Sequence, residues 1–283
     1  MSDILSEMSD TQASPLTKDF KIDLPEDVSF IINTIEKNGH QAYAVGGCVR
    51  DTIMGVTPND WDITTNALPE EVKSYFTKTI DTGIQHGTVT VMLHSTGYEV
   101  TTYRIDGDYL DGRHPSSVEF SDRLTDDLCR RDFTINAMAY NERTGLVDEY
   151  GGIDDINNKV IRCVGRPEER FTEDALRMMR AIRFSAQLGF TIEDNTYKAI
   201  EKLSANIQKV SMERVCVELK KTLMSDNPDF CRLYGTTNLF KDILPQLHDS
   251  FTKRQSKRIL LTCKYSEKEL PLRLTACLSN GTP

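Results

Sequence analysis

No apolar stretch of this sequence approaches the roughly 18 residues that a membrane-spanning helix requires, so we expect no membrane span. The first 19 residues are polar and acidic, and they lack the basic start and apolar middle of an export signal. Residues 1–22 are therefore expected to form a flexible N-terminal arm.

The sequence also lacks a C-x-x-C pair, so nothing in its cysteine spacing indicates zinc or redox chemistry. An odd number of scattered cysteines is typical of a reducing compartment, and we expect a cytoplasmic protein. The seven cysteines are Cys48, Cys129, Cys163, Cys216, Cys231, Cys263 and Cys277.

Three further motifs are missing. The sequence contains neither Gly-x-x-x-x-Gly-Lys nor Gly-x-Gly-x-x-Gly, which weakens the case for a P-loop kinase or a dinucleotide-binding dehydrogenase. It contains no His-Glu-x-x-His, so His86 and His114 are expected to be ordinary loop or strand residues.

The composition is that of an ordinary globular protein, with 283 residues, 39% hydrophobic and 27% charged. This length allows two modest domains. The net charge is -9, but residues 205–283 carry 13 Lys and Arg against 8 Asp and Glu, so residues 1–204 carry a net charge of -14. The acidic front could hold metal ions and the basic rear could hold a polyanion, although a solvated basic face explains the rear equally well.

Strand signals are confined to the first half of the chain. Short segments rich in Val, Ile, Thr and Tyr alternate with helical patterns there, and residues 105–120 read as a loop without periodicity. The expected strands are 41–45, 60–64, 89–93 and 99–104, and the expected helices are 28–38, 47–55 and 69–76.

Long helical periodicity dominates beyond residue 172. The expected helices are 172–188, 193–207 and 211–224, with a further helical group from residue 228 onward. The sequence thus predicts an α+β protein, with a small mixed sheet flanked by helices followed by an all-helical part. We place the first domain at residues 23–166 and a basic, all-helical domain at residues 167–283.

Asp60-Trp61-Asp62 is the most informative short segment. In a strand, residues two apart point to the same face, so Asp60 and Asp62 would converge while Trp61 turns toward the core. Paired carboxylates suit Mg²⁺, and two such ions can hold the attacking and leaving oxygens of a phosphoryl transfer. Taken alone, however, two solvated carboxylates on an edge strand explain this segment better.

A glycine turn precedes the paired acids. Gly46-Gly47-Cys48-Val49-Arg50 leads from a strand into a helix, where glycines permit close approach of backbone N–H groups to phosphate and Arg50 adds a positive charge. The order of glycine turn, Arg, Asp-x-Asp and then a strand acid at Glu99 favours nucleotide chemistry over an ordinary turn.

Five motifs in this order resemble the class II tRNA nucleotidyltransferases, or CCA-adding enzymes, and the related bacterial poly(A) polymerases of the DNA polymerase beta type superfamily. The resemblance covers residues 43–223. The motifs are residues 43–51 (Tyr-Ala-Val-Gly-Gly-Cys-Val-Arg-Asp), 59–65 (Asn-Asp-Trp-Asp-Ile-Thr-Thr), 128–137 (Leu-Cys-Arg-Arg-Asp-Phe-Thr-Ile-Asn-Ala), 148–152 (Asp-Glu-Tyr-Gly-Gly) and 173–177 (Glu-Asp-Ala-Leu-Arg).

The resemblance implies a role for each matching residue. Asp60 and Asp62 would bind two Mg²⁺ ions, with Glu99 as the third catalytic carboxylate. Three further groups would bind the nucleotide: Gly46, Gly47 and Arg50 at the triphosphate; Arg131, Asp132 and Asn136 at the ribose; and Asp174 with Arg177 at the base edge.

The Asp174 and Arg177 pair has a simpler interpretation. With Thr172 as helix N-cap, the two residues would lie on one helical face, and on spacing alone an intrahelical ion pair is the better explanation. As a base reader, the pair would suit cytosine and adenine, each of which presents an exocyclic amine beside a bare ring nitrogen. Arg180, Arg183 and Arg214 are candidates for RNA contact, and for Arg180 and Arg183 a solvated helix face is an equal alternative.

The implied activity is addition of C, C and A to the 3′ end of tRNA from CTP and ATP. The segment Asp111-Gly-Arg-His-Pro115 lies where such enzymes keep a flexible element needed for the final A. Family members are usually longer, so the chain resembles a C-terminally short member. Poly(A) addition and a catalytically idle RNA-binding remnant stay open as alternatives, and the sequence leaves the oligomeric state unknown.

Overall fold

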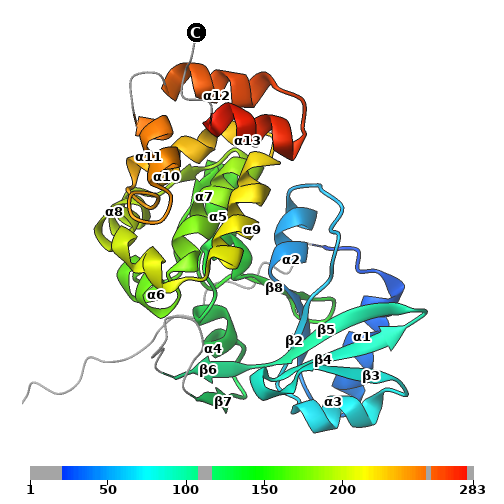
Figure 1. Cartoon of the computed structure of the whole chain (residues 1–283). Helices are drawn as coiled ribbons and strands as arrows, with labels where there is room; N and C mark the ends of the chain where they lie inside the picture. The colour runs from blue at the N-terminus through cyan, green and yellow to red at the C-terminus, as the bar shows by residue number, and fades with distance from the viewer. Residues whose placement is uncertain (1–20, 108–116, 253–255, 279–283) are drawn as a thin grey trace, which may run out of the picture.

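The computed structural model describes residues 21–107, 117–252 and 256–278. A sheet-containing part forms one end of the molecule, and a helical part packs against it (Figure 1). The mixed sheet followed by helices confirms the predicted fold class. Asp111 and its neighbours up to Pro115 lie outside the described residues.

The sheet has the strand order β3-β4-β5-β2-β1-β8-β9. The pairing of β2 with β5 is parallel and the other neighbours are antiparallel, so the sheet is mixed. Its strands are β1 (Ala42–Val45), β2 (Ile63–Thr65), β3 (Thr79–Gly83), β4 (Thr88–Leu93), β5 (Thr96–Thr102), β8 (Ala139–Asn141) and β9 (Gly145–Val147).

β1 runs through the middle of the sheet, paired with β2 on one side and β8 on the other. All four of its residues are buried. α1 packs on it through Val28, Ile31, Ile32 and Ile35, whose spacing of three and four residues places them on one buried face. Complete burial of such a side chain stabilises the fold by about 1.5 to 3 kcal/mol.

Five helices and two 3₁₀ turns accompany the sheet in the described residues. They are α1 (Glu26–Lys37), α2 (Gly47–Ile53), α3 (Pro69–Tyr75), α4 (Leu124–Cys129) and α5 (Gly152–Asn158), with η1 (Ile84–His86) and η2 (Thr134–Asn136). The expected helices 28–38, 47–55 and 69–76 correspond to α1, α2 and α3.

Three strand predictions need correction. The expected strand 60–64 begins only at Ile63, so Asp60 and Asp62 lie in the extended segment that enters β2. The two ends of the expected loop 105–120 are strands, because β6 (Arg104–Asp106) pairs with β7 (Val118–Phe120) in antiparallel orientation. Strand signals also continue beyond residue 152, where β10 (Val160–Ile161) pairs in parallel with β11 (Thr191–Ile192). Segments of two or three residues are too short to show periodicity.

The helical part follows from residue 167. Its elements are α6 (Pro167–Glu173), α7 (Leu176–Leu188), α8 (Asp194–Leu203), η3 (Ser204–Lys209), α9 (Met212–Leu223), η4 (Pro228–Cys231), α10 (Arg232–Thr236), α11 (Pro245–Thr252), α12 (Ser256–Tyr265) and α13 (Leu270–Leu278). α12 and α13 lie at the end farthest from the sheet (Figure 1). No helix within the described ranges has both the length and the apolar character to cross a membrane.

The expected helix 172–188 is in fact two helices. Thr172 lies inside α6, where its hydroxyl donates to the Glu168 carbonyl, so it is not an N-cap. Asp174 is extended at the break, and its Oδ1 accepts from the Leu176 N–H. Asp174 and Arg177 therefore do not share a helix. The carboxylate of Asp174 itself opens α7, in the way that an acidic cap does.

α7 is the central helix of the molecule. It packs against α9, and its Phe184 meets Phe133 of the sheet part edge to face, with ring centroids 5.8 Å apart. Arg183 of α7 is almost fully buried and donates from Nε to Glu218 of α9 at 2.7 Å. A buried charge left without its partner is costly, so this ion pair fixes how the two helices pack.

We expect Glu218→Ala to lower the free energy of unfolding by about 3 kcal/mol, because it leaves the buried Arg183 guanidinium without its counter-ion. Urea unfolding followed by circular dichroism measures this. Glu213→Ala removes an exposed carboxylate from the same helix and is the matched control, for which a change within about 0.5 kcal/mol is expected. Equal stability of the two variants would contradict the assigned role of the ion pair.

Candidate active site

A polar cavity of about 670 Å³ lies where α2, η2 and α7 meet. The sheet part contributes one wall and α7 with α9 contribute the other. The lining residues are Gly46, Gly47, Cys48, Arg50, Asp51, Asn59, Asp60, Asp62, Arg131, Asp132, Asn136, Arg180, Arg183, Phe184, Gln187, Leu188 and Lys221. We call this space the guanidinium cavity, because four arginines line it.

A second cavity of about 500 Å³ holds the three predicted catalytic carboxylates. Asp60 and Asp62 line both cavities, and Glu99 of β5 lines the second one beside them. Glu99 reaches this place because β5 lies next to β2 in the sheet. Trp61 lines the second cavity beside these carboxylates but not the guanidinium cavity, and it also packs against the hydrophobic core.

The three carboxylates influence one another electrostatically. Burial by the surrounding protein raises the pKa of Asp62, although the residue stays accessible from the cavities, and the negative charges of Glu99 and Asp60 raise it further. The guanidinium of Arg131 opposes this shift. The surroundings therefore disfavour the charged form of Asp62, and Arg131 only partly compensates for this.

Hard oxygen ligands of this kind fit Mg²⁺. The oxygen atoms of Asp60, Asp62 and Glu99 do not all lie within 4.8 Å of one another, so they form no tight cage among the described residues. Like charges repel, and a divalent cation between them would relieve that repulsion. The donor set thus fits a divalent metal ion bound mainly by Asp60 and Asp62.

Gly46 is favoured mainly by its backbone conformation. Its φ of +83° lies in the left-handed region, and a Cβ atom there would meet Arg131 Nη1 at 2.9 Å. With Gly46 as N-cap, α2 begins at the cavity wall, and Gly47 is its first residue. The N-terminus of a helix favours a phosphate group, because its first N–H groups lack partners within the helix.

Asp132 is the centre of the hydrogen-bond network behind this wall. Its Oδ2 accepts from Arg180 at 2.6 to 2.7 Å, and its Oδ1 accepts from Asn136 at 3.1 Å. Asn136 in turn accepts from Arg50 at 2.5 Å. Burial would raise the pKa of Asp132, but Arg180 and Asn136 lower it to about 2. The network therefore fixes the positions of Arg50 and Arg180 at the cavity.

Phe184 lies beneath three of the cavity arginines. The guanidinium carbons of Arg50, Arg180 and Arg183 lie 5.1, 5.4 and 3.7 Å from its ring centroid. Each cation–π contact contributes about 0.5 to 2 kcal/mol. The ring therefore helps to stabilise three neighbouring positive charges, two from α7 and one from α2.

A second buried carboxylate holds the remaining arginines of the same motif. Asp127 accepts from Arg130 at 2.6 Å and from Arg131 at 3.0 Å. Burial alone would raise the pKa of Asp127, yet Arg131 and Arg130 lower it. Asp127 thus keeps its negative charge and orients Arg131 toward the cavity.

The predicted base-reading pair lies apart from the cavity lining. Asp174 pairs with Arg214 at 2.7 Å, and Arg177 pairs with Glu173 at 2.7 Å. The intrahelical ion pair that spacing suggested between Asp174 and Arg177 is thus replaced by two pairs with other partners. Arg177 also donates to the Arg130 carbonyl at 2.9 Å, which ties the start of α7 to the motif behind the cavity.

The three RNA-contact candidates are all engaged within the protein. Arg180 and Arg183 line the guanidinium cavity and pair with Asp132 and Glu218, whereas Arg214 pairs with Asp174. A solvated helix face does not describe Arg183, which is buried.

The sequence analysis assigned no role to several lining residues, among them Phe184, Gln187 and Lys221. A signal for two of them was present, because Arg180, Phe184 and Gln187 recur at the three- and four-residue spacing of one helical face. Lys221 of α9 joins them only through packing of α9 against α7.

Two family models match this chain. Residues 42–162 match the poly A polymerase head domain, and residues 189–251 match the probable RNA and SrmB-binding site of polymerase A. The first match contains the three carboxylates and the glycine turn of the candidate site.

Individual relatives agree with these matches. The CCA-adding enzyme of Leuconostoc mesenteroides is 54% identical over 198 residues, which cover 70% of this chain and 49% of that protein. The CCA-adding enzyme of Ligilactobacillus salivarius is 50% identical over 210 residues, covering 74% and 51%. The crystal structure of the Bacillus stearothermophilus CCA-adding enzyme in complex with CTP has a TM-score of 0.72 at 37% identity, covering 85% and 57%. The chain spans about half the length of the curated relatives it matches.

We expect Asp132→Asn to lower the free energy of unfolding by about 2 kcal/mol at pH 7, because the folded-state pKa of about 2 lies below the ordinary value of 3.8. This stabilisation is complete above about pH 4 and is lost as the pH falls toward 2. Urea unfolding of both proteins between pH 7 and pH 2.5 measures it. The difference should shrink over the acid range, whereas exposed Asp122→Asn should show no such trend. A pH-independent difference would contradict the role of the charge.

Proposed function

Because this chain belongs to the family of tRNA nucleotidyltransferases and poly(A) polymerases, we propose that it adds C, C and A to the 3′ end of tRNA. CTP and ATP are the nucleotide substrates and pyrophosphate is the second product. The names of the similar proteins support this activity over other members of the family.

One observation carries the proposal. Asp60 and Asp62 stand at the wall between a cavity of carboxylates and a cavity of guanidinium groups. A nucleotide triphosphate needs positive groups along its phosphates and a metal ion at the reacting phosphate. The two cavities together supply the positive groups and the metal-binding carboxylates. Each cavity has a volume in the range of small-ligand sites.

The reaction forms one phosphorus–oxygen bond and breaks another. The terminal 3′ hydroxyl oxygen of tRNA bonds to the α-phosphorus of the nucleotide and gives up its proton to solvent. The bond from that phosphorus to the oxygen bridging the α- and β-phosphates breaks, and pyrophosphate leaves. Mg²⁺ held by Asp60 and Asp62 would supply stabilisation of the charge on the reacting phosphate. Glu99 adds a third carboxylate at the same place.

The remaining groups position the nucleotide. Arg50, with the backbone of Gly46 and Gly47, binds the triphosphate, since the start of α2 and a guanidinium group meet there. Arg131, Asp132 and Asn136 are assigned to the ribose. Because Asp132 is engaged with Arg180, it acts mainly by holding that arginine in place.

Base selection is assigned to Asp174 and Arg177. A carboxylate accepts from the exocyclic amine of cytosine or adenine, and a guanidinium donates to the adjacent ring nitrogen. Uracil and guanine reverse this pattern and would leave buried polar groups unpaired, at about 1 to 3 kcal/mol each. To reach a base, Asp174 must release Arg214 and Arg177 must release Glu173. All four side chains keep some access to solvent, so the partner that each pair releases can be hydrated.

We expect Asp60→Asn and Asp62→Asn each to lower nucleotide incorporation by about 100-fold or more, because a neutral amide holds Mg²⁺ weakly. The assay combines the chain, tRNA lacking its CCA end, Mg²⁺ and labelled CTP or ATP. Glu142→Gln removes an exposed carboxylate of the same part and should retain full activity.

The same assay separates the alternatives. Incorporation of C followed by A supports the proposal, whereas incorporation of A alone indicates a poly(A) polymerase. No incorporation by the unchanged chain would reject both activities and leave an RNA-binding remnant. Full activity of either Asn variant would reject the assigned metal ligands.

We expect Asp174→Ala to reduce the preference for CTP over UTP by about 10- to 100-fold while changing triphosphate affinity little. Single-turnover incorporation with each nucleotide measures the preference. Arg214→Ala removes the present partner of Asp174 and leaves the carboxylate, so it should retain discrimination. If the two variants lose discrimination equally, Asp174 acts only through its ion pair.

A further inference from the structure

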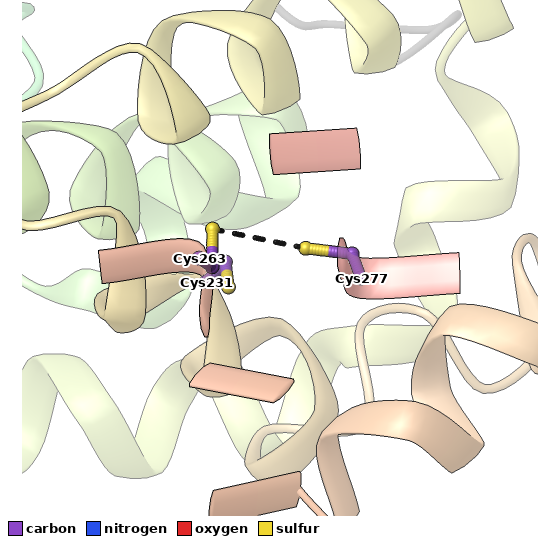
Figure 2. Close-up of side chains that lie close together, drawn as sticks. All are labelled: Cys231, Cys263 and Cys277. Atoms are coloured by element: carbon purple, nitrogen blue, oxygen red, sulfur yellow. Dashed lines mark hydrogen bonds between the residues drawn. The ribbon is translucent and has the colours of Figure 1, made fainter. Parts of the chain in front are cut away.

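Three cysteines far apart in the sequence meet inside the helical part. Cys231 ends η4, Cys263 lies on α12 and Cys277 lies on α13. Their sulfur atoms all lie within 4.8 Å of one another, and the Sγ atoms of Cys263 and Cys277 are 4.0 Å apart. Figure 2 shows the Cys277 side chain pointing toward the other two. We call these three residues the cysteine cluster.

The cluster is sealed from solvent. Cys231 and Cys263 are 0% exposed, and Cys277 is 1% exposed. A single buried cysteine commonly serves as a small apolar side chain. Three sulfur atoms that converge from three separate elements form a ligand set, and it is the one group of three or more metal-ligating side chains within this distance among the described residues.

The sulfur spacing fits a tetrahedral metal ion. With zinc–sulfur bonds of about 2.3 Å, two thiolates on one tetrahedral ion lie about 3.8 Å apart. The observed 4.0 Å between Cys263 and Cys277 is close to this value. A disulfide would require these sulfurs to approach to about 2.05 Å and would leave the third thiol unpaired.

Two neighbouring groups suit a negatively charged metal–thiolate site. Arg273, four residues before Cys277, is buried, lies within electrostatic range of Cys263 and forms no ion pair within the described part of the chain. Its Nη1 donates to the carbonyls of Leu223 and Ser225, while its buried Nε has no partner among the described residues. Three thiolates on one divalent cation carry a net charge of -1, or -2 with a carboxylate as fourth ligand, and this guanidinium would offset one negative charge.

Asp229 offers a further donor. It precedes Cys231 by two residues, and its charge acts on Cys263. Its Oδ1 atom is buried without a hydrogen-bond partner within the described ranges. The carboxylate lies outside the group of three sulfurs, so a side-chain rotation would be needed to bring this oxygen to a shared ion.

We propose that the cysteine cluster binds one Zn²⁺ ion, with three thiolates as ligands and Asp229 as the fourth. Each thiol gives up its proton to solvent when the ion binds, so loading releases up to three protons. Because the ligands come from η4, α12 and α13, the ion fastens the last two helices to the rest of the helical part. This structural site is separate from the Mg²⁺ site and independent of the proposed activity.

The direct test is cobalt binding by the full chain. The reduced, metal-free chain is titrated with Co²⁺ in the presence of excess Mg²⁺, which occupies carboxylate sites. Sulfur ligands give a thiolate-to-cobalt charge-transfer absorption that carboxylate ligands cannot give. We expect this absorption to saturate at one ion per chain and to be displaced by Zn²⁺, and the unfolding temperature to rise with Zn²⁺.

Substitutions identify the ligands. Cys263→Ala and Cys277→Ala should each lower the affinity for Co²⁺ by 100-fold or more. Cys216→Ala changes an exposed cysteine of α9 and is the matched control, which should bind Co²⁺ as the unchanged chain does. Circular dichroism of each variant shows whether its helices have formed.

Three results would overturn the proposal. The first is a folded, fully reduced chain that gives no charge-transfer absorption with excess Co²⁺, a result that does not depend on how any variant folds. The second is a purified chain whose mass is two units low because two thiols of the cluster have joined as a disulfide. The third is retention of the absorption in both alanine variants.

Discussion

The ion pair between Asp132 and Arg180 is the interaction on which the candidate site depends. It joins the sheet part to α7 across 48 residues of sequence. Asp132 also accepts a hydrogen bond from Asn136, and Asn136 accepts one from Arg50 at the cavity wall. Because all these groups are buried or half-buried, losing one of them leaves a charge without its partner. The same contacts therefore set both the positions of the cavity arginines and the packing of the two parts.

Charge is arranged around that pair in two adjoining regions. On one side lie Asp60, Asp62 and Glu99, where burial and then the negative charges of Glu99 and Asp60 raise the pKa of Asp62. On the other side, Arg50 and Arg180 stack over the ring of Phe184, together with Arg183. A nucleotide bound with a divalent cation has the same division, with its metal ion at one end of the reacting group and phosphate oxygens along the other. This match underlies the proposed nucleotidyl transfer.

The fold was predictable where the local pattern was strong. The buried face of α1 recurs every three or four residues, and the strands β1 and β4 are continuous apolar or β-branched segments, so the predictions there agree with the structure. The break at Asp174 was missed because both flanking segments are helical and the break follows from a capping bond to Leu176. Strands as short as β10 were missed because they exist only through pairing with a distant segment.

For the site, the sequence by itself determined which chemistry the chain can carry, since the glycine turn and Asp60-Trp61-Asp62 are local motifs whose spacing already sets what the backbone and carboxylates present. Only the tertiary structure decided which charge meets which. It paired Arg180 with Asp132 and Asp174 with Arg214, and it gathered three cysteines that share no spacing. The physical reason is that such contacts depend on how helices pack. Packing is driven by burial of apolar surface, which is non-directional, so the local sequence does not specify which polar side chains will meet.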